Sequence, residues 1–365
     1  MLLPLALAAA AILLPATASA TTAATPPTPP TSAATASASS RDITKILNAE
    51  RSAHASGSGL HPFATTGGSS SFTPLPDVYP VGKTGGFAVD VVHGVAARYP
   101  SPAMNHRNLP IEIWYPAASG RISSSDTFWA TARGGHFPLI VFAAGYNSNP
   151  DTYQPFLHAL AAQGYIVAAP VFPIEASIAG AAPAGRSNTE MLNQMWDMST
   201  VISQMINYAR QPGNFLGAAM SQTQIGVIGH SDGAMTVAGM TMSTSFNDRR
   251  IKMAVVMSGA GPLGLSWNNR HVVPLMVEQA TGDPYNNPAN SQWLFNHVTG
   301  SRSYLTVAGP YHIWPLIGND KVSDLVRRSV VGDLNVTLKG AGMPVFFSMV
   351  GAGDTPGFTS LKFAT

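Results

Sequence analysis

The sequence of 365 residues contains no cysteine. The chain therefore forms no disulfide, offers no thiolate ligand to a metal and cannot use a cysteine nucleophile. Charged residues are also scarce, at 10% of the chain, with a formal net charge of +2 and no cluster of Lys and Arg. Because nucleic-acid binding needs a concentrated basic surface, this composition predicts no nucleic-acid partner.

Motifs for metals and cofactors are missing as well. No two histidines stand at helical spacing, no carboxylate cluster resembles a calcium loop, and no glycine-rich loop is suited to phosphate. The sequence therefore predicts a protein that needs no metal and no cofactor.

Long apolar runs are restricted to the first 20 residues. Leu2 to Leu14 is apolar but too short to span a bilayer, and Ala18-Ser19-Ala20 has the small-x-small pattern of a cleavage site. Residues 1–20 are thus predicted to be a signal peptide, cleaved after Ala20, and the protein to be secreted. No Lys or Arg precedes the apolar stretch, so an uncleaved anchor is the alternative. No transmembrane segment is expected after cleavage.

Residues 21–73 are rich in Thr, Ala, Ser and Pro. Such a composition cannot bury enough apolar surface to offset the entropy of ordering, and it predicts a flexible tether. Arg41 to Arg51 differs, because Ile43, Ile46 and Leu47 stand at helical spacing. Docking of this short stretch on the folded part and disorder are both open.

Residues 74–365 alternate short apolar runs with longer amphipathic ones, and 45% of the whole chain is hydrophobic. This alternation predicts a single α/β domain with a mostly parallel central sheet and helices on both faces. We expect it to be a monomer. The predicted strands are Ile111–Tyr115, Leu139–Ala143, Ile166–Pro170, Ile225–Ile228, Met253–Met257, Pro274–Gln279 and Tyr304–Val307. The predicted helices are Thr152–Gln163, Thr189–Arg210, Gly233–Met242, Asn290–His297 and Lys321–Leu338.

The strongest functional motif is Gly229-His230-Ser231-Asp232-Gly233, directly after the apolar run Ile225–Ile228. A serine with glycine two positions away on either side, between a strand and a helix, is typical of a nucleophile on a sharp turn. The turn strains the serine backbone, and side chains at the two glycine positions would collide with neighbouring strands. A glycine-rich turn without catalytic function is the alternative.

A serine nucleophile needs a base, and the base needs an orienting acid. Functional residues of parallel sheets lie at the carboxyl ends of strands. Asp283 follows the run Pro274–Gln279, and His312 follows the run Tyr304–Val307. These positions predict Asp283 as the acid and His312 as the base of Ser231. A turn aspartate before proline is the alternative for Asp283.

Other candidates fit less well. His230 and Asp232 adjoin the serine, but neighbours of such a serine point away from its hydroxyl. His271 precedes a strand and His297 ends a helix, whereas Asp320 is placed to cap the last predicted helix.

Acyl transfer at a serine also needs donors for the oxyanion of the tetrahedral intermediate. The backbone N–H of Asp232, next to the nucleophile, is one predicted donor. The other is the N–H of Tyr146, in the loop after the run Leu139–Ala143.

From about Pro74 onward, the chain resembles the α/β-hydrolase superfamily. The resemblance rests on Phe137 to Pro173, Gly229 to Gly233, Pro274 to Pro284 and Tyr304 to His312. Within the superfamily it is most similar to exported bacterial serine esterases of the dienelactone-hydrolase-like group. That group includes cutinase-like polyester hydrolases and platelet-activating-factor acetylhydrolase-like enzymes.

The resemblance implies a secreted hydrolase of carboxylic esters that works through an acyl-enzyme, with Ser231, Asp283 and His312 as the triad. Its substrate would be a small or polymeric ester. An acyltransferase using the same triad and a non-catalytic binding protein with the same fold are the alternatives. Polyester hydrolases commonly carry a hydrophobic residue where this chain has Asp232, which implies a more polar cleft floor.

Overall fold

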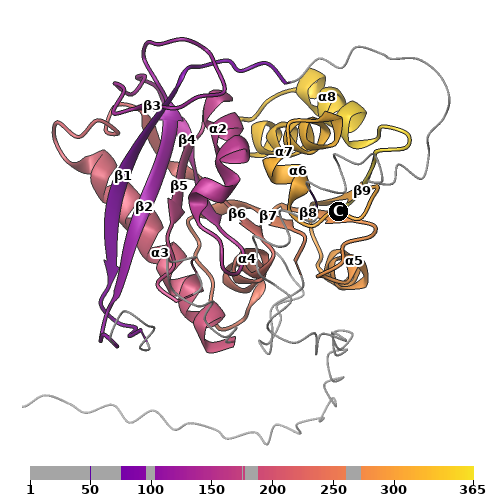
Figure 1. The fold of residues 1–365 in the computed structure, drawn as a ribbon, viewed down its shortest axis with the longest axis horizontal. Helices are drawn as coiled ribbons and strands as arrows, with labels where there is room; N and C mark the ends of the chain where they lie inside the picture. The colour runs from indigo at the N-terminus through magenta and orange to yellow at the C-terminus, as the bar shows by residue number, and fades with distance from the viewer. Residues whose placement is uncertain (1–49, 51–74, 96–102, 175, 177–187, 260–272) are drawn as a thin grey trace, which may run out of the picture.

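The computed structural model describes residue 50 and residues 75–95, 103–174, 176, 188–259 and 273–365. The predicted signal peptide and most of the predicted tether lie outside the described residues. The described chain forms a ten-stranded sheet covered by helices, shown in Figure 1. None of its helices is both long enough and apolar enough to cross a bilayer.

The strands are β1 (Val81–Asp90), β2 (Arg107–Pro116), β3 (Thr127–Phe128), β4 (Phe137–Ala143), β5 (Ile166–Pro170), β6 (Met220–His230), β7 (Ile251–Met257), β8 (Leu275–Ala280), β9 (Arg302–Val307) and β10 (Thr359–Ala364). The helices are the 3-10 turn η2 (Pro150–Tyr153) and α2 (Gln154–Ala162), α3 (Asn188–Arg210), α4 (Asp232–Met242), α5 (Pro288–His297), α6 (Trp314–Ile317), α7 (Lys321–Lys339) and α8 (Met343–Gly353).

The strand order is β10-β9-β8-β7-β6-β4-β5-β2-β1-β3. The central strands β5, β4, β6, β7, β8 and β9 are parallel, whereas β2 joins β5, β1 joins β2 and β10 joins β9 in antiparallel fashion. The prediction of a mostly parallel sheet is confirmed. Because neighbouring parallel strands have their carboxyl ends at the same edge of the sheet, the loops after β4, β6, β8 and β9 all lie at that edge.

Two hydrophobic clusters fill the space on either side of this sheet. Alternate residues of a strand point to opposite faces, so Leu139 and Val141 of β4 join one cluster while Ile140 and Phe142 join the other. Helices α3, α4 and α5 pack on the first face, and α2, α6 and α7 on the second (Figure 1). The central strands are thus buried on both sides, which explains their continuous apolar sequences.

All seven predicted strands and all five predicted helices are present, with ends shifted by a few residues. The structure adds β1, β3 and β10 at the sheet edges, and α6 and α8 near the C-terminus. The candidate active site lies at the central strands, all of which the sequence predicted.

Candidate active site

Ser231 occupies the turn between β6 and α4 with φ = 56° and ψ = −117°. A positive φ is rare for a residue other than glycine and costs of order 1–3 kcal/mol. The surrounding backbone holds it, because the Ser231 N–H donates to Met257 O at 3.0 Å and the Ala234 N–H donates to Ser231 O at 3.1 Å. Ser231 is therefore fixed at the N-terminus of α4, beyond the edge of the sheet.

The two flanking glycines are required by close backbone contacts. A Cβ on Gly229 would lie 2.1 Å from Gly233 O, and a Cβ on Gly233 would lie 2.1 Å from Ala143 O. Both distances are far inside van der Waals contact, and the blocking atoms are backbone atoms. The glycine pattern seen in the sequence is thus a steric requirement of this turn.

Three side chains that are far apart in sequence meet at this turn. His312 Nε2 lies 3.1 Å from Ser231 Oγ, and His312 Nδ1 lies 2.9 Å from Asp283 Oδ2. His312 is in the loop after β9, and Asp283 is in the loop after β8. The structure therefore brings together the three residues predicted as the triad, in hydrogen-bonding order.

The surroundings of Asp283 hold its carboxylate in one orientation. Its Oδ1 accepts the backbone N–H groups of Tyr285 and Asn286 at 2.8 and 3.0 Å, and its Oδ2 also accepts from Gln279 Nε2 at 2.9 Å. Burial alone would raise the pKa of Asp283, but the charge of His312 and the hydrogen bonds from His312, Asn286 and Tyr285 outweigh burial and lower that pKa. The carboxylate is therefore ionised at neutral pH and can orient the His312 ring.

The loop after β4 lies against the serine. The position of a Cβ on Gly145 would be 3.1 Å from Ser231 Cβ, so the glycine lets this loop approach the nucleophile. Tyr146 follows directly and is 9% exposed, and Asp232 is 1% exposed. Both predicted oxyanion donors thus lie on segments adjoining Ser231. Asn147 has φ = 52°, so the loop turns sharply just after Tyr146.

His230 and Tyr153 lie buried beneath the site, both fully excluded from solvent. Tyr153 Oη lies 2.9 Å from His230 Nδ1 and 3.0 Å from the Gly145 nitrogen, and His230 Nε2 lies 3.0 Å from His312 O. As predicted, His230 points away from the serine hydroxyl. Sequence reasoning gave it no other role, and only its position inside the Gly-x-Ser-x-Gly motif hinted at one.

Glu50 is a site neighbour that sequence reasoning missed. Its carboxylate accepts the backbone N–H groups of His312 at 2.7 Å, Ile313 at 3.3 Å and Trp314 at 2.6 Å. Burial raises the pKa of Glu50, and these hydrogen bonds together with the charge of His312 offset part of that rise. Glu50 lies in the stretch Arg41 to Arg51, whose other residues are outside the described ones.

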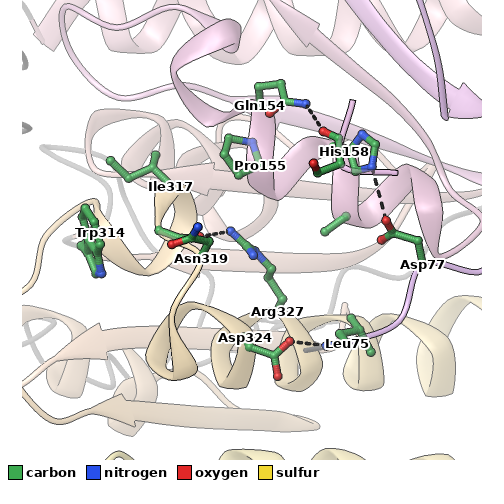
Figure 2. Close-up of a pocket in the computed structure, with 13 residues that line it drawn as sticks. Leu75, Asp77, Gln154, Pro155, His158, Trp314, Ile317, Asn319, Asp324 and Arg327 are labelled. Carbon is green, nitrogen blue, oxygen red and sulfur yellow. Dashed lines mark hydrogen bonds and ion pairs between the residues drawn. The ribbon is translucent and has the colours of Figure 1, made fainter. Parts of the chain in front are cut away.

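A cavity of about 500 Å³ lies between α2 and the segment from α6 to α7 (Figure 2). Its lining includes Trp314 but none of Ser231, Asp283 and His312. Figure 2 shows His158 directed at Asp77, with an Nε2–Oδ2 distance of 3.7 Å, while Arg327 donates to Gly318 O. His158 and Arg327 thus each contact a group of the protein, while Arg327 Nε has no hydrogen-bond partner within the described residues.

Within the described residues, no group of three or more His, Asp or Glu side chains is arranged to hold an ion. The chemistry available at Ser231 is that of a hydroxyl, an imidazole, a carboxylate and backbone N–H groups.

Comparison with known proteins bears on the fold and the family of the chain. The family model described as Chlorophyllase matches residues 113–275. Among solved structures, a ferulic acid esterase from Streptomyces cinnamoneus superposes with a TM-score of 0.59 and 18% identity, covering 80% of this chain and 98% of that one. No curated protein matches the sequence significantly. This likeness shows the fold, a mostly parallel sheet with helices on both faces of the α/β-hydrolase type.

Proposed function

We propose that this protein is a serine hydrolase of carboxylic esters. The observation that carries the proposal is the hydrogen-bonded series Ser231–His312–Asp283 at a serine with a positive φ. The names of the matched family model and of the structural neighbour, a chlorophyllase and an esterase, support ester hydrolysis as the reaction class.

In the proposed acylation step, neutral His312 accepts the proton of Ser231 Oγ on Nε2 while Oγ attacks the ester carbonyl carbon. Asp283 accepts the Nδ1–H of His312 and stabilises the imidazolium that forms. The N–H groups of Tyr146 and Asp232 would hold the oxyanion. Collapse of the intermediate breaks the bond to the alcohol oxygen, which takes the proton from Nε2.

In the proposed deacylation step, water replaces the alcohol. His312 takes a proton from the water as its oxygen attacks the acyl-enzyme, and returns that proton to Ser231 Oγ as the acid leaves.

The decisive test is the behaviour of Ser231. We expect the purified protein to hydrolyse p-nitrophenyl esters and an active-site fluorophosphonate to label Ser231. Ser231→Ala should abolish both, with an unchanged circular dichroism spectrum. Folded wild-type protein that neither turns over esters nor is labelled would support a non-catalytic binding protein instead, and transfer of the acyl group to added alcohols in preference to water would support an acyltransferase.

Export and subgroup belong to the same proposal. We expect the signal peptide 1–20 to be removed after Ala20 and the protein to be secreted, which N-terminal sequencing of protein from culture medium would test. Membership of the dienelactone-hydrolase-like group predicts turnover of short-chain esters. Activity on polyester films would separate a cutinase-like enzyme from one restricted to small esters.

A further inference from the structure

The hydrogen atoms of the His230 contacts can be assigned from chemistry. A carbonyl oxygen only accepts hydrogen bonds, so Nε2 of His230 must carry the proton that bonds His312 O. Burial, together with the charge of His312, lowers the pKa of His230 to about 3. The ring is therefore neutral at physiological pH, and its Nδ1 is a bare acceptor.

The direction of the remaining bonds follows. The Tyr153 hydroxyl must donate to His230 Nδ1, because Nδ1 has no proton to give. Tyr153 Oη in turn accepts the backbone N–H of Gly145. A single directed series runs from Gly145 N–H through Tyr153 O–H and the His230 ring to the carbonyl oxygen of His312.

The two ends of this series belong to the two halves of the proposed site. Gly145 immediately precedes Tyr146, a proposed oxyanion donor, and His312 is the proposed base. Their loops follow β4 and β9, between which β6, β7 and β8 lie in the sheet. The segments after these loops also pack on each other, because α6 contacts η2 and α2, and the directed series adds a hydrogen-bonded connection between the loops themselves.

We infer that Tyr153 and His230 are positioning residues that fix the oxyanion loop and the catalytic histidine relative to each other; this inference rests on the proposed function. Neither residue touches the substrate. Tyr153 sets the position of Gly145 and hence of the next N–H, while His230 sets the backbone of His312 and hence its ring.

The packing around the pair supports this role. Both side chains are fully buried, and their rings lie 5.5 Å apart. The Tyr153 ring also packs on Phe142 of β4 at 4.8 Å, and the His230 ring lies 4.7 Å from the His312 ring. Ser148 Oγ donates to Gly145 O at 2.6 Å, so the carbonyl of Gly145 is held as well as its N–H. The pair has little freedom to move independently of the two loops.

Three substitutions test the two ends of the hydrogen-bonded series one at a time. Tyr153→Phe removes the partner of Gly145. His230→Asn keeps an acceptor near the Nδ1 position but cannot reach His312 O. His230→Gln places an amide N–H near the Nε2 position and keeps the bond to His312.

The matched control is Tyr165→Phe. Tyr165 is also fully buried and belongs to the same hydrophobic cluster as Tyr153, but its hydroxyl donates to Asn335 Oδ1 at 2.7 Å, away from the site. Tyr165→Phe thus removes a phenolic hydroxyl from the same hydrophobic cluster.

The readout is kcat/KM for two acetate esters, because this ratio reports acylation. p-Nitrophenolate leaves without a proton, whereas ethoxide must be protonated by His312. A misplaced His312 therefore slows hydrolysis of ethyl acetate more than hydrolysis of p-nitrophenyl acetate. A misplaced oxyanion donor slows hydrolysis of both esters equally. Misplacement of reacting groups by about 1 Å can cost about 100-fold.

We expect Tyr153→Phe to lower kcat/KM about tenfold for both esters, on the scale of such misplacements. His230→Asn should lower it at least about tenfold more for ethyl acetate than for p-nitrophenyl acetate, and His230→Gln should show a smaller difference. Tyr165→Phe should stay within about twofold of the wild type.

The inference is overturned if Tyr153→Phe and His230→Asn fold and behave like Tyr165→Phe on both esters while the wild type is active and Ser231→Ala is not. That outcome leaves the proposed function intact. A wild type with no esterase activity and no labelling of Ser231 would instead refute the proposed function.

A measurement on the wild type keeps the inference testable if the variants do not fold. In ¹⁵N spectra of histidine-labelled protein, we expect one imidazole with its proton on Nε2 and no titration between pH 5 and 9. Assignment of His230 as protonated on Nδ1, or as titrating in that range, would refute the directed series and with it the inference.

Discussion

The Glu50 carboxylate accepts the backbone N–H of His312 at 2.7 Å across a separation of 262 residues. Because His230 donates to the carbonyl of the same residue, both backbone groups of His312 are held by side chains. As the proposed base, His312 fixed in this way would need little reorganisation when its ring takes up a proton.

Replacing Glu50 by Ala should therefore lower activity without preventing folding. Three N–H groups of the loop lose their acceptor, so the His312 ring is held less firmly, and we expect kcat to fall about tenfold with little change in KM. Glu50→Gln should have a smaller effect, since it keeps one acceptor oxygen but loses the charge. Steady-state kinetics on p-nitrophenyl acetate measures both.

Asp90→Asn is the control for Glu50. Asp90, the last residue of β1, is also a buried carboxylate that accepts two backbone N–H groups, from Val92 at 2.8 Å and His93 at 3.2 Å, but these belong to the loop after β1 and not to the site. If Asp90→Asn and Glu50→Ala reduce kcat equally, the effect of Glu50 reflects general loss of stability.

Replacing Asp283 by Asn should be far more damaging. Asparagine keeps an acceptor for Tyr285 and Asn286 N–H, but its amide no longer selects the His312 tautomer that leaves Nε2 free. The equivalent change in serine proteases costs about 10⁴ in kcat, and we expect a similar loss with intact thermal unfolding. Residual activity within about tenfold of the wild type would argue against Asp283 as the acid.

The sequence predicted the central strands because a parallel sheet covered on both faces requires short continuous apolar runs. The glycines of β1 concealed that strand: Gly82 is needed because the Tyr115 ring lies 2.3 Å from the position of its Cβ, a contact invisible in sequence. Likewise, α8 packs on α7 where Met349 lies 2.4 Å from the Cβ position of Gly332.

The residues of the candidate site also divide into those with a local sequence signal and those without one. Ser231, Asp283 and His312 could be predicted because each stands in a motif or directly after a predicted strand. Glu50 could not, because it contacts a loop 262 residues away, and Tyr153 could not, because its hydroxyl meets His230, 77 residues away; such contacts leave no local spacing. His230 was correctly expected to avoid the serine hydroxyl, yet its two hydrogen bonds depend on the tertiary structure.

His158 predicts a loss of stability at alkaline pH. Burial lowers the pKa of His158, but the hydrogen bond to Asp126 and the charges of Asp126 and Asp77 raise it to about 9, above the unfolded value near 6.5. Its stabilising contribution is complete below pH 6.5 and is lost as the pH rises through 9. Urea unfolding of His158→Gln should therefore show a deficit against the wild type at pH 6 that shrinks by pH 10. A deficit independent of pH would contradict the charged pair.

Glu278 predicts a second pH dependence from a different cause. It lies in β8, fully buried, and its Oε1 has no hydrogen-bond partner within the described residues. Burial, with the negative charge of Asp283, raises its pKa to about 8. Between the unfolded value near 4.5 and pH 8, the folded state keeps a proton that the unfolded state releases, so unfolding becomes easier as the pH rises through this window.

Glu278→Gln removes this titration while keeping the shape of the neutral acid. One pKa unit corresponds to about 1.4 kcal/mol of free energy. At pH 9 we therefore expect the unfolding free energy of the variant to exceed that of the wild type by a few kcal/mol, on the order of a few such units. At pH 5 the two proteins should have the same unfolding free energy. Urea unfolding at pH 5, 7 and 9 measures the difference. If the unfolding free energies of the two proteins changed with pH in parallel, Glu278 would be ionised in the folded state. Its negative charge would then act on His312 together with that of Asp283.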